Sequence, residues 1–305
     1  MDTEDPKTAR HAARRRERWA ILGVIVLLLA AVGVPQAFRA AGNGDADGAA
    51  PAPHLRAVVL AWDQLPDAAQ AETYVDDIAR RGADAVCLAL PVWQEHAASN
   101  SVFIEYRRSP APARLEALIA HGRGRGLRVA VMPVLRLAQP ASGEWPGGIE
   151  PTEPYSWWED YENIVLFYAR VAAAAKAEIF CLGSELVSTT EQTQRWRALI
   201  DKVAKVYPDG RIAYSANRSN FRTLRWWSDL NLMAATVHGG AGGDGLPTLD
   251  DLLDRRRPVA AEVLAHGGRI GKEVLLNLVV PAEAIREPAA SASARPPRTT
   301  TRTNR

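Results

Sequence analysis

The chain contains little cysteine. Among its 305 residues there are two, Cys87 and Cys181, and each lies inside an apolar run of strand length. Two cysteines in a chain of this length do not build the disulfide framework of a small secreted domain, so we interpret both as small buried hydrophobes. The sequence also lacks a cysteine and histidine cluster with the spacing of metal ligands, which argues against a zinc site. We expect no metal and no cofactor.

The chain also lacks a strong excess of charge of either sign. Its formal net charge is +2, so the overall balance indicates no polyanionic partner, and we expect no nucleic acid. Basic residues gather at the two ends, within segments 1–18 and 282–305. A basic end can contact nucleic acid or lipid, but we favour a solvated, disordered tail for residues 282–305.

Long apolar runs are absent except at residues 19–34. This run is somewhat shorter than the roughly 20 residues of a full membrane span, and a block of arginines precedes it. The order fits a cleaved signal peptide or an uncleaved signal anchor, and we favour the anchor. Basic residues beside a membrane span tend to remain on its cytoplasmic side. We therefore predict a cytoplasmic segment at 1–18 and a single pass through the cell membrane at 19–34. A linker follows at 35–54, and the rest of the chain is predicted to be extracytoplasmic.

From residue 55 onward, apolar runs of strand length alternate with helical patterns. Strands are predicted at residues 55–62, 83–93, 127–137, 178–182, 211–216, 231–237 and 273–280. Helices are predicted at residues 67–81, 114–125, 157–175, 191–207 and 249–266. Unbroken apolar strands are typical of a parallel sheet buried on both faces, and strict alternation favours a doubly wound sheet or a barrel. The number of strands favours a (β/α)8-type TIM barrel over residues 55–281.

Chemistry in such barrels occurs at the carboxyl ends of the strands. The residues found there are Trp62, Asp63, Trp93, Gln94, Glu95, His96, Arg136, Gly183, Ser184, Glu185, Asn217 and His238. Trp145, Trp157 and Trp158 lie in or beside the long loop after the third strand. Aromatic rings stack on sugar rings, and carboxylates and polar groups meet the hydroxyls, so this set indicates carbohydrate chemistry.

Glu185 is the best candidate for a general acid. Cleavage of a glycosidic bond needs one carboxylic acid to protonate the leaving oxygen and a second carboxylate on the other face of the sugar. Glu185 ends a buried strand beside the small residues Gly183 and Ser184. The alternative is that Glu185 only caps the next helix. Trp226 and Trp227 fit a packing role as well as a ligand role.

Several motifs resemble the family 113 glycoside hydrolases, the endo-β-mannanase-like branch of clan A. They are VAVMPVLRL at residues 129–137, FCLGSEL at 180–186 followed by WRALI at 196–200, and IAYSAN at 212–217. The resemblance runs from about residue 56 to about residue 276. It implies a (β/α)8 barrel and retaining hydrolysis of a β-linked polysaccharide such as mannan. It also implies that Glu185 is the acid/base, with Arg136 and Asn217 in polar positions around the reacting sugar.

The sequence departs from the family pattern near its end. The family carries a nucleophilic Glu at the end of strand seven, where this chain has Leu278. His238 stands where an aromatic residue is usual, and Arg218 follows Asn217 in place of an aromatic one. No eighth strand is recognisable after Pro281, so we expect an incomplete barrel with open edges. A truncation or reading-frame change in the gene is our hypothesis for this shift.

Three functions fit these observations. The first is an extracytoplasmic glycosidase with Glu185 as acid/base and with substrate contacts from Trp62, Trp93, Arg136, Trp145, Asn217 and His238. The second is a carbohydrate-binding pseudoenzyme that has lost its nucleophile, and Leu278 favours it for the chain as written. The third is a non-catalytic membrane-anchored scaffold, which the strand-end aromatic residues argue against. Glu283 or Glu287 remains open as a displaced nucleophile.

Overall fold

The computed structural model describes residues 54–65, 67–80, 82–238 and 249–279. The predicted anchor at 19–34, the segment before it and the tail at 282–305 all lie outside these residues. Within the described part of the chain, no helix combines the length and the apolar character needed to cross a bilayer.

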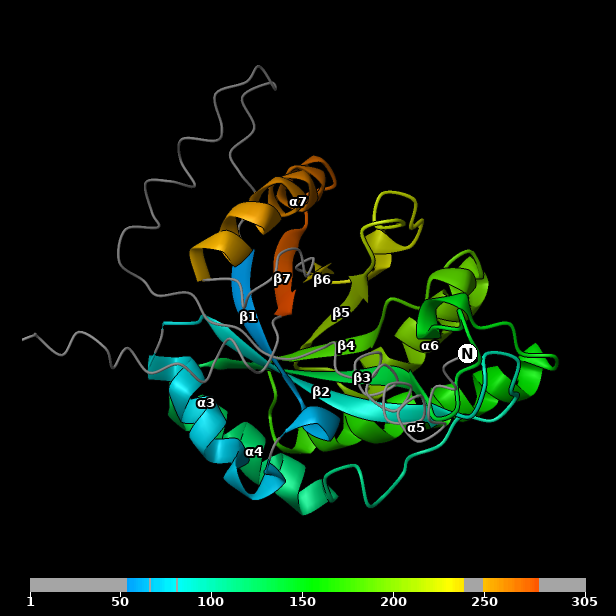
Figure 1. The fold of residues 1–305 in the computed structure, drawn as a ribbon, viewed down its shortest axis with the longest axis horizontal. Coiled ribbons are helices and arrows are strands. Elements are labelled where there is room, and N and C mark those ends of the chain that lie inside the picture. The colour runs from blue at the N-terminus through cyan, green and yellow to red at the C-terminus, as the bar shows by residue number, and fades with distance from the viewer. Residues whose placement is uncertain (1–53, 66, 81, 239–248, 280–305) are drawn as a thin grey trace, which may run out of the picture.

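Seven parallel strands form a closed barrel in the order of the sequence. They are β1 (His54–Ala61), β2 (Ala85–Gln94), β3 (Arg128–Leu137), β4 (Ile179–Ser184), β5 (Arg211–Ala216), β6 (Leu232–His238) and β7 (Glu273–Val279). Figure 1 shows these strands in the centre of the molecule, with the helices around them. The predicted parallel barrel is therefore confirmed, and the predicted strand at 211–216 has the observed bounds.

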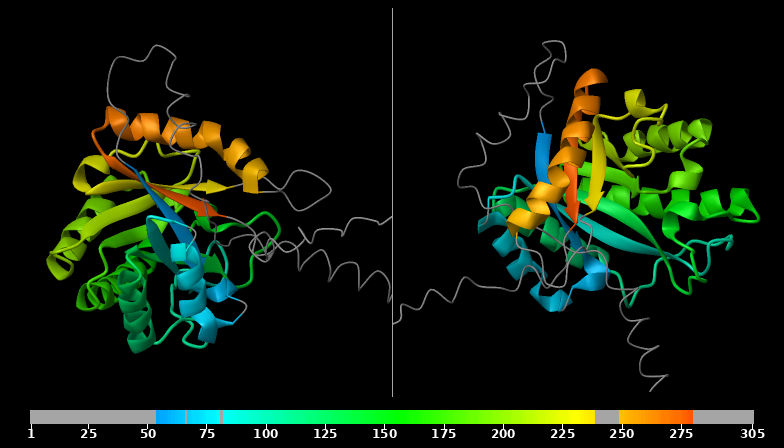
Figure 2. Two further views of the ribbon diagram at one scale, coloured as in Figure 1. Left: turned by 90° about the vertical axis from the view of Figure 1, so that its left-hand side faces the viewer. Right: turned by 45° about the horizontal axis from the view of Figure 1, so that its top comes forward.

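In the described part of the chain, five α-helices cover the outside of the barrel. They are α3 (Ala71–Arg80), α4 (Pro112–Gly124), α5 (Pro154–Ala174), α6 (Thr193–Val206) and α7 (Leu249–Arg269). Single turns of 3-10 helix precede α3, at η1 (Trp62–Gln64) and η2 (Ala68–Gln70), or lie between later helices, at η3 (Pro146–Gly148), η4 (Val187–Thr189) and η5 (Trp227–Asp229). Figure 2 shows the helices wrapped around the sheet from two further directions.

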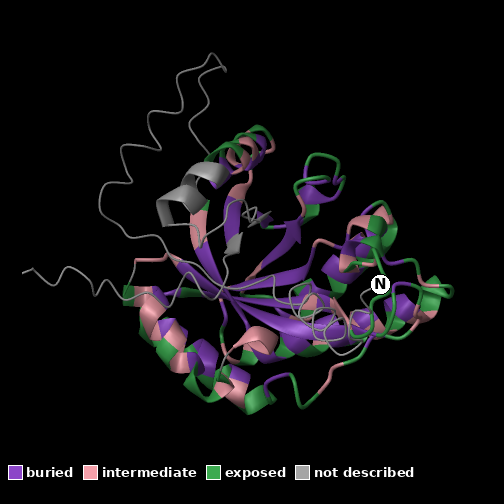
Figure 3. Ribbon diagram, viewed as in Figure 1, coloured by how far each residue is buried: buried purple, intermediate pink, exposed green. Residues whose placement is uncertain are grey.

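The strands are apolar on both faces because each face is buried against a different partner. Inward residues form one cluster in the barrel, in which small side chains such as Ala57, Cys87, Ala130 and Cys181 predominate. Outward residues are mostly larger, and they pack under the helices in a second cluster. Side chains alternate across a strand, so one unbroken apolar run serves both clusters. Figure 3 shows the strands buried and the outer helix faces exposed.

The expectation of open barrel edges was wrong. β7 pairs directly with β1 in parallel, with Ala57 opposite Asn277 and Val58 opposite Leu278. β7 pairs with β6 on its other side. The backbone groups that would form an edge are therefore used between the first and last described strands, and the seven strands close without an eighth.

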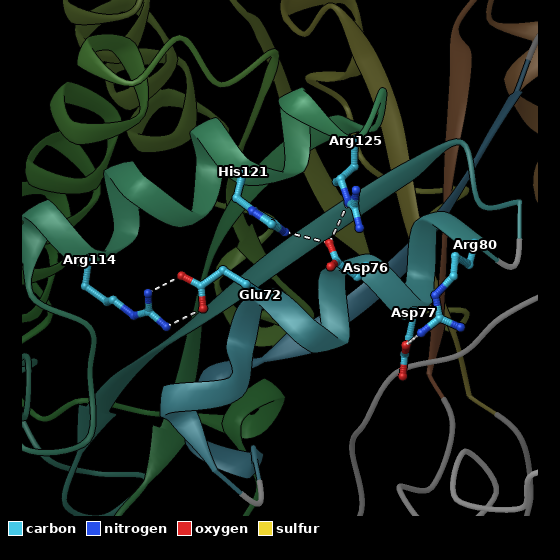
Figure 4. Close-up of polar contacts among 7 residues, drawn as sticks. All are labelled: Glu72, Asp76, Asp77, Arg80, Arg114, His121 and Arg125. Carbon is cyan, nitrogen blue, oxygen red and sulfur yellow. Dashed lines mark hydrogen bonds and ion pairs between the residues drawn. The ribbon is translucent and has the colours of Figure 1, made fainter.

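The helices α3 and α4 lie side by side and are joined by ion pairs (Figure 4). Arg114 of α4 pairs with Glu72 of α3. His121 and Arg125 both contact an oxygen of Asp76, each at 2.6 Å. These groups link the two helices on the outer surface of the barrel.

Candidate active site

The parallel strands bring their carboxyl ends to one mouth of the barrel. Trp93 and Arg136 stand opposite each other in the β2 and β3 register. Glu185 directly follows β4, and Asn217 directly follows β5. Residues far apart in the sequence thus meet at the face where barrel enzymes carry their chemistry.

Glu185 and Asn217 are hydrogen-bonded to each other. The side-chain amide of Asn217 donates to Oε1 of Glu185 at 2.6 Å. The backbone N–H of Glu185 donates to the carbonyl of Ser215, in β5, at 2.8 Å. Glu185 is half-buried. Strand β5 therefore fixes both the backbone and the carboxylate of the residue that we expected to be the acid.

A layer of buried polar side chains lies below this pair. The hydroxyls of Ser215 and Thr236 share a hydrogen bond of 2.8 Å, and Ser184 lies 3.4 Å from Thr236, oxygen to oxygen. The amide of Asn277 donates to the Ser215 hydroxyl at 2.9 Å. Strands β4 to β7 each contribute one residue. Ser215, Thr236 and Asn277 were not predicted from the sequence, although a polar residue inside an apolar strand run is a recognisable signal.

Arg136 binds a carboxylate from the first strand end. Its Nε donates to Asp63 at 3.1 Å. Both side chains are largely buried, at 17% and 8% exposed. The sequence placed Arg136 at a strand end but did not reveal that its guanidinium turns toward Asp63. The pair gives the mouth of the barrel a fixed, polar wall on the side of β1 and β3.

The predicted aromatic residues fall into two groups. Trp145 is 45% exposed and lies against Gly147, where an added Cβ would meet both the Trp145 ring and the Glu185 carbonyl. It is an open ring next to the Glu185 backbone. Trp93 is only 5% exposed, and the Arg108 guanidinium covers its ring at 3.6 Å from the centroid. Trp93 is thus covered rather than open.

The remaining tryptophans have structural contacts. Trp62 is half-buried in η1. Trp157 and Trp158 lie in the first turns of α5, as the predicted helix at 157–175 implies, and their indole N–H groups donate to Gln94 at 2.7 Å and Gln192 at 2.9 Å. A small cavity of about 230 Å³ is lined by both rings and by Ser188.

Strand pairing places the backbone of two further residues singled out from the sequence, His238 and Leu278. His238 is the last residue of β6 and pairs with Val279. Leu278 lies in β7, between Val58 of β1 and Val237 of β6. Glu283 and Glu287 lie outside the described residues.

A model of Glycoside Hydrolase Family 113 matches residues 63–263, which is more than half of the chain. No curated protein sequence matches. Among solved structures, a GH113 β-mannanase from Alicyclobacillus acidocaldarius in complex with ManMIm is 21% identical, with a TM-score of 0.54. The match covers 68% of this chain and 64% of that one, so this chain spans less than two thirds of that mannanase.

Two further mannanases of the same family have similar folds. A GH113 β-1,4-mannanase is 20% identical with a TM-score of 0.58, covering 74% of this chain and 88% of that one. The complex of another GH113 β-1,4-mannanase is 23% identical with a TM-score of 0.51, covering 70% and 69%. At these identities the structures establish a shared barrel fold.

Proposed function

Because the chain belongs to Glycoside Hydrolase Family 113, we propose that it binds and hydrolyses a β-linked, mannan-like polysaccharide with Glu185 as the acid/base. The observation that carries this proposal is the hydrogen bond from Asn217 to the Glu185 carboxylate at the mouth of the barrel. The solved structures of similar fold are described as β-mannanases, which supports the choice of sugar.

The chemistry follows from the position of Glu185. A carboxylic acid at the mouth of the barrel can protonate the glycosidic oxygen as the bond to the sugar breaks, and the carboxylate that remains can then take a proton from water. The neutral amide of Asn217 fixes the orientation of the group. In this proposal, Trp145 stacks on a sugar ring, and Arg136, Asn217, His238 and Trp62 make further substrate contacts.

A second candidate is a carbohydrate-binding protein with impaired turnover. The observation that favours it is Leu278, which occupies the strand-seven position where the resemblance implies a nucleophilic Glu. Retaining hydrolysis needs a second carboxylate about 5–5.5 Å from the acid. In this alternative the Glu185 side of the mouth still binds sugar, but no covalent glycosyl intermediate forms.

One set of measurements tests both candidates. Mannohexaose binding is measured by calorimetry, and hydrolysis by the release of reducing ends, for the full chain, Glu185→Gln and Leu278→Glu. A hydrolase binds and cleaves, and Glu185→Gln keeps binding while losing roughly 10²–10⁴-fold in rate. An impaired binder binds without cleaving, and Leu278→Glu raises its rate. Cleavage that survives Glu185→Gln unchanged would show that the acid is elsewhere.

We also propose that the barrel lies outside the cytoplasm, tethered to the cell membrane through residues 19–34. This rests on the basic segment 1–18 followed by an apolar run, an order that places the basic segment in the cytoplasm. Protease added to intact cells should then digest the barrel. A barrel that stays intact until the cells are lysed would contradict this location.

A further inference from the structure

The backbone of Glu185 has an unfavourable conformation. Its φ is +55°, in the left-handed region. This region is costly for a residue with a long side chain, because Cβ crowds the following carbonyl oxygen. Such a conformation persists only where the surrounding structure holds it in place, and it is common at active sites. The contacts that hold Glu185 therefore matter for the direction of its carboxylate.

Strand β5 supplies three of these contacts from successive parts of its end. The Ser215 carbonyl accepts from the Glu185 N–H at 2.8 Å. The Tyr214 hydroxyl accepts from the next backbone N–H, that of Leu186, at 2.9 Å. Asn217 bonds the carboxylate itself. The peptide bond that follows Glu185 is thus held by the side chain of Tyr214, whose ring lies on the outer side of the barrel.

The Tyr214 ring is packed tightly on its outer side. It is completely buried, and it makes edge contacts with both Trp196 and Trp226, at centroid distances of 5.0 and 4.9 Å, while these two rings stack on each other at 4.8 Å. The two indoles donate to the carbonyls of Thr189 and Thr190, at 3.0 and 3.1 Å. One aromatic cluster therefore fixes both ends of the segment from Glu185 to Thr190.

The Tyr214 hydroxyl stays neutral. Burial in this cluster raises the pKa of Tyr214 well above its ordinary value. A neutral phenol keeps a lone pair for the Leu186 N–H across the pH range of any hydrolysis assay. The contact therefore does not change as the carboxyl of Glu185 gains and loses its proton.

We propose that Tyr214 is a positioning residue, whose hydroxyl holds the Leu186 amide and thereby keeps Glu185 in the left-handed conformation that directs its carboxylate to Asn217. The inference rests on the proposed role of Glu185 as acid/base. Tyr214 acts through the backbone and does not touch substrate. Loss of the hydroxyl frees the Leu186 N–H and lets the Glu185 backbone relax toward an ordinary conformation.

The test compares Tyr214→Phe with Tyr207→Phe. Tyr207 is a matched control, because it is also a buried tyrosine and its hydroxyl donates to the Ala177 carbonyl, before the opposite end of β4, at 2.5 Å. Both variants should lower the Tm. Only Tyr214→Phe should lower kcat, by roughly 10–100-fold with little change in KM, and alter the pH profile. It should also move the ¹³C carboxyl resonance of Glu185, which is assigned by its loss in Glu185→Gln.

The carboxyl resonance separates failure of this inference from failure of the proposed function. If the full chain neither binds nor cleaves mannohexaose, the proposed function fails, but the resonance still reports whether Tyr214 orients Glu185. If Tyr214→Phe and Tyr207→Phe leave that resonance and its titration equally unchanged, the positioning role is overturned.

A second measurement applies if Tyr214→Phe does not fold. Glycine adopts a left-handed backbone at no steric cost, so Glu185→Gly should have a higher Tm than Glu185→Gln. A lower Tm for the glycine variant would show that Glu185 is not strained, and the proposal would be overturned with it.

Discussion

The two ends of the barrel each carry a glutamate, with different partners. At the amino-terminal end, Glu273 pairs with Arg211 at 2.8 Å and lies 3.9 Å from Arg128. At the carboxyl-terminal end, Glu185 accepts a hydrogen bond from the amide of Asn217. Arg128 also pairs with Glu178, at 3.4 Å. The lower end is thus crossed by ion pairs that join strands β3, β5 and β7 and Glu178, the residue before β4. At the mouth, one contact to the Glu185 carboxylate comes from an uncharged donor, the amide of Asn217.

These contacts show how a glutamate can serve either structure or proton transfer, depending on its partner. A guanidinium strongly favours the ionised form of a carboxylate, so a carboxylate beside it is suited to structure rather than to proton transfer. A neutral amide orients the group and discriminates less between its two protonation states. A general acid must gain and lose a proton in each cycle. The arginines around Glu273 and the Asn217 amide on Glu185 therefore distinguish these two glutamates.

The largest effect is expected from breaking the ion pair of Asp63 and Arg136. Arg136→Met leaves Asp63, which is 8% exposed, without its guanidinium, and we expect a loss of about 3 kcal/mol in the free energy of unfolding. Urea unfolding measures it. The double variant Asp63→Asn with Arg136→Met should recover most of the loss. No recovery would mean that Arg136 stabilises the barrel through packing alone.

The next effect concerns the neutral partner of Glu185. Asn217→Ala removes the donor to Oε1, and we expect kcat to fall roughly 100-fold, or about 2.7 kcal/mol in barrier height, because the acid is no longer oriented. Asn231→Ala is a matched control, since the Asn231 side chain accepts from the Ile212 N–H at the other end of β5 at 2.7 Å. It should cost stability and leave kcat unchanged. Equal kcat values for the two variants would contradict the contrast between the ends.

A smaller effect is expected at the lower end of the barrel. Glu273→Gln removes a charge that two arginines share, and because the groups are partly exposed we expect the unfolding free energy to fall by about 1 kcal/mol. Glu178→Gln should lower the unfolding free energy by less, since the pair of Glu178 with Arg128 is longer and more exposed than the pair of Glu273 with Arg211. Mannohexaose affinity should be the same in both variants as in the parent chain, and a change in affinity would link the two ends.

The smallest effect is expected on the outer surface between α3 and α4. The Arg125 hydrogen bond, followed by that of His121, lowers the pKa of Asp76 below its ordinary value. A carboxyl whose folded pKa is depressed stabilises the fold above its unfolded pKa and loses that contribution as pH falls through the folded value. Asp76→Asn should therefore flatten the fall in Tm between pH 5 and about pH 3. A fall in Tm as steep as in the parent chain would assign the acid sensitivity to other groups.

Much of the barrel was predictable from the sequence because its signals are local. An apolar run long enough for a strand, followed by a helical pattern, can be recognised within a few dozen residues, and β5 was predicted with its observed bounds. The same pattern identified Glu185 and Asn217 as strand-end residues. Parallel alignment of the strands was then enough to bring them to one mouth.

Other features depended on contacts between distant segments. The sequence predicted open edges, but closure of the sheet depends on whether β7 meets β1, which only the curvature of all seven strands decides. The pairing of Arg136 with Asp63, the left-handed backbone of Glu185 and the Tyr214 contact likewise join different strands or loops. Which residues stand at the strand ends follows from the sequence alone, because strand and helix periodicity is a property of neighbouring residues. Which partner each of them has depends on the folded barrel, because partners are set by how distant strands pack together.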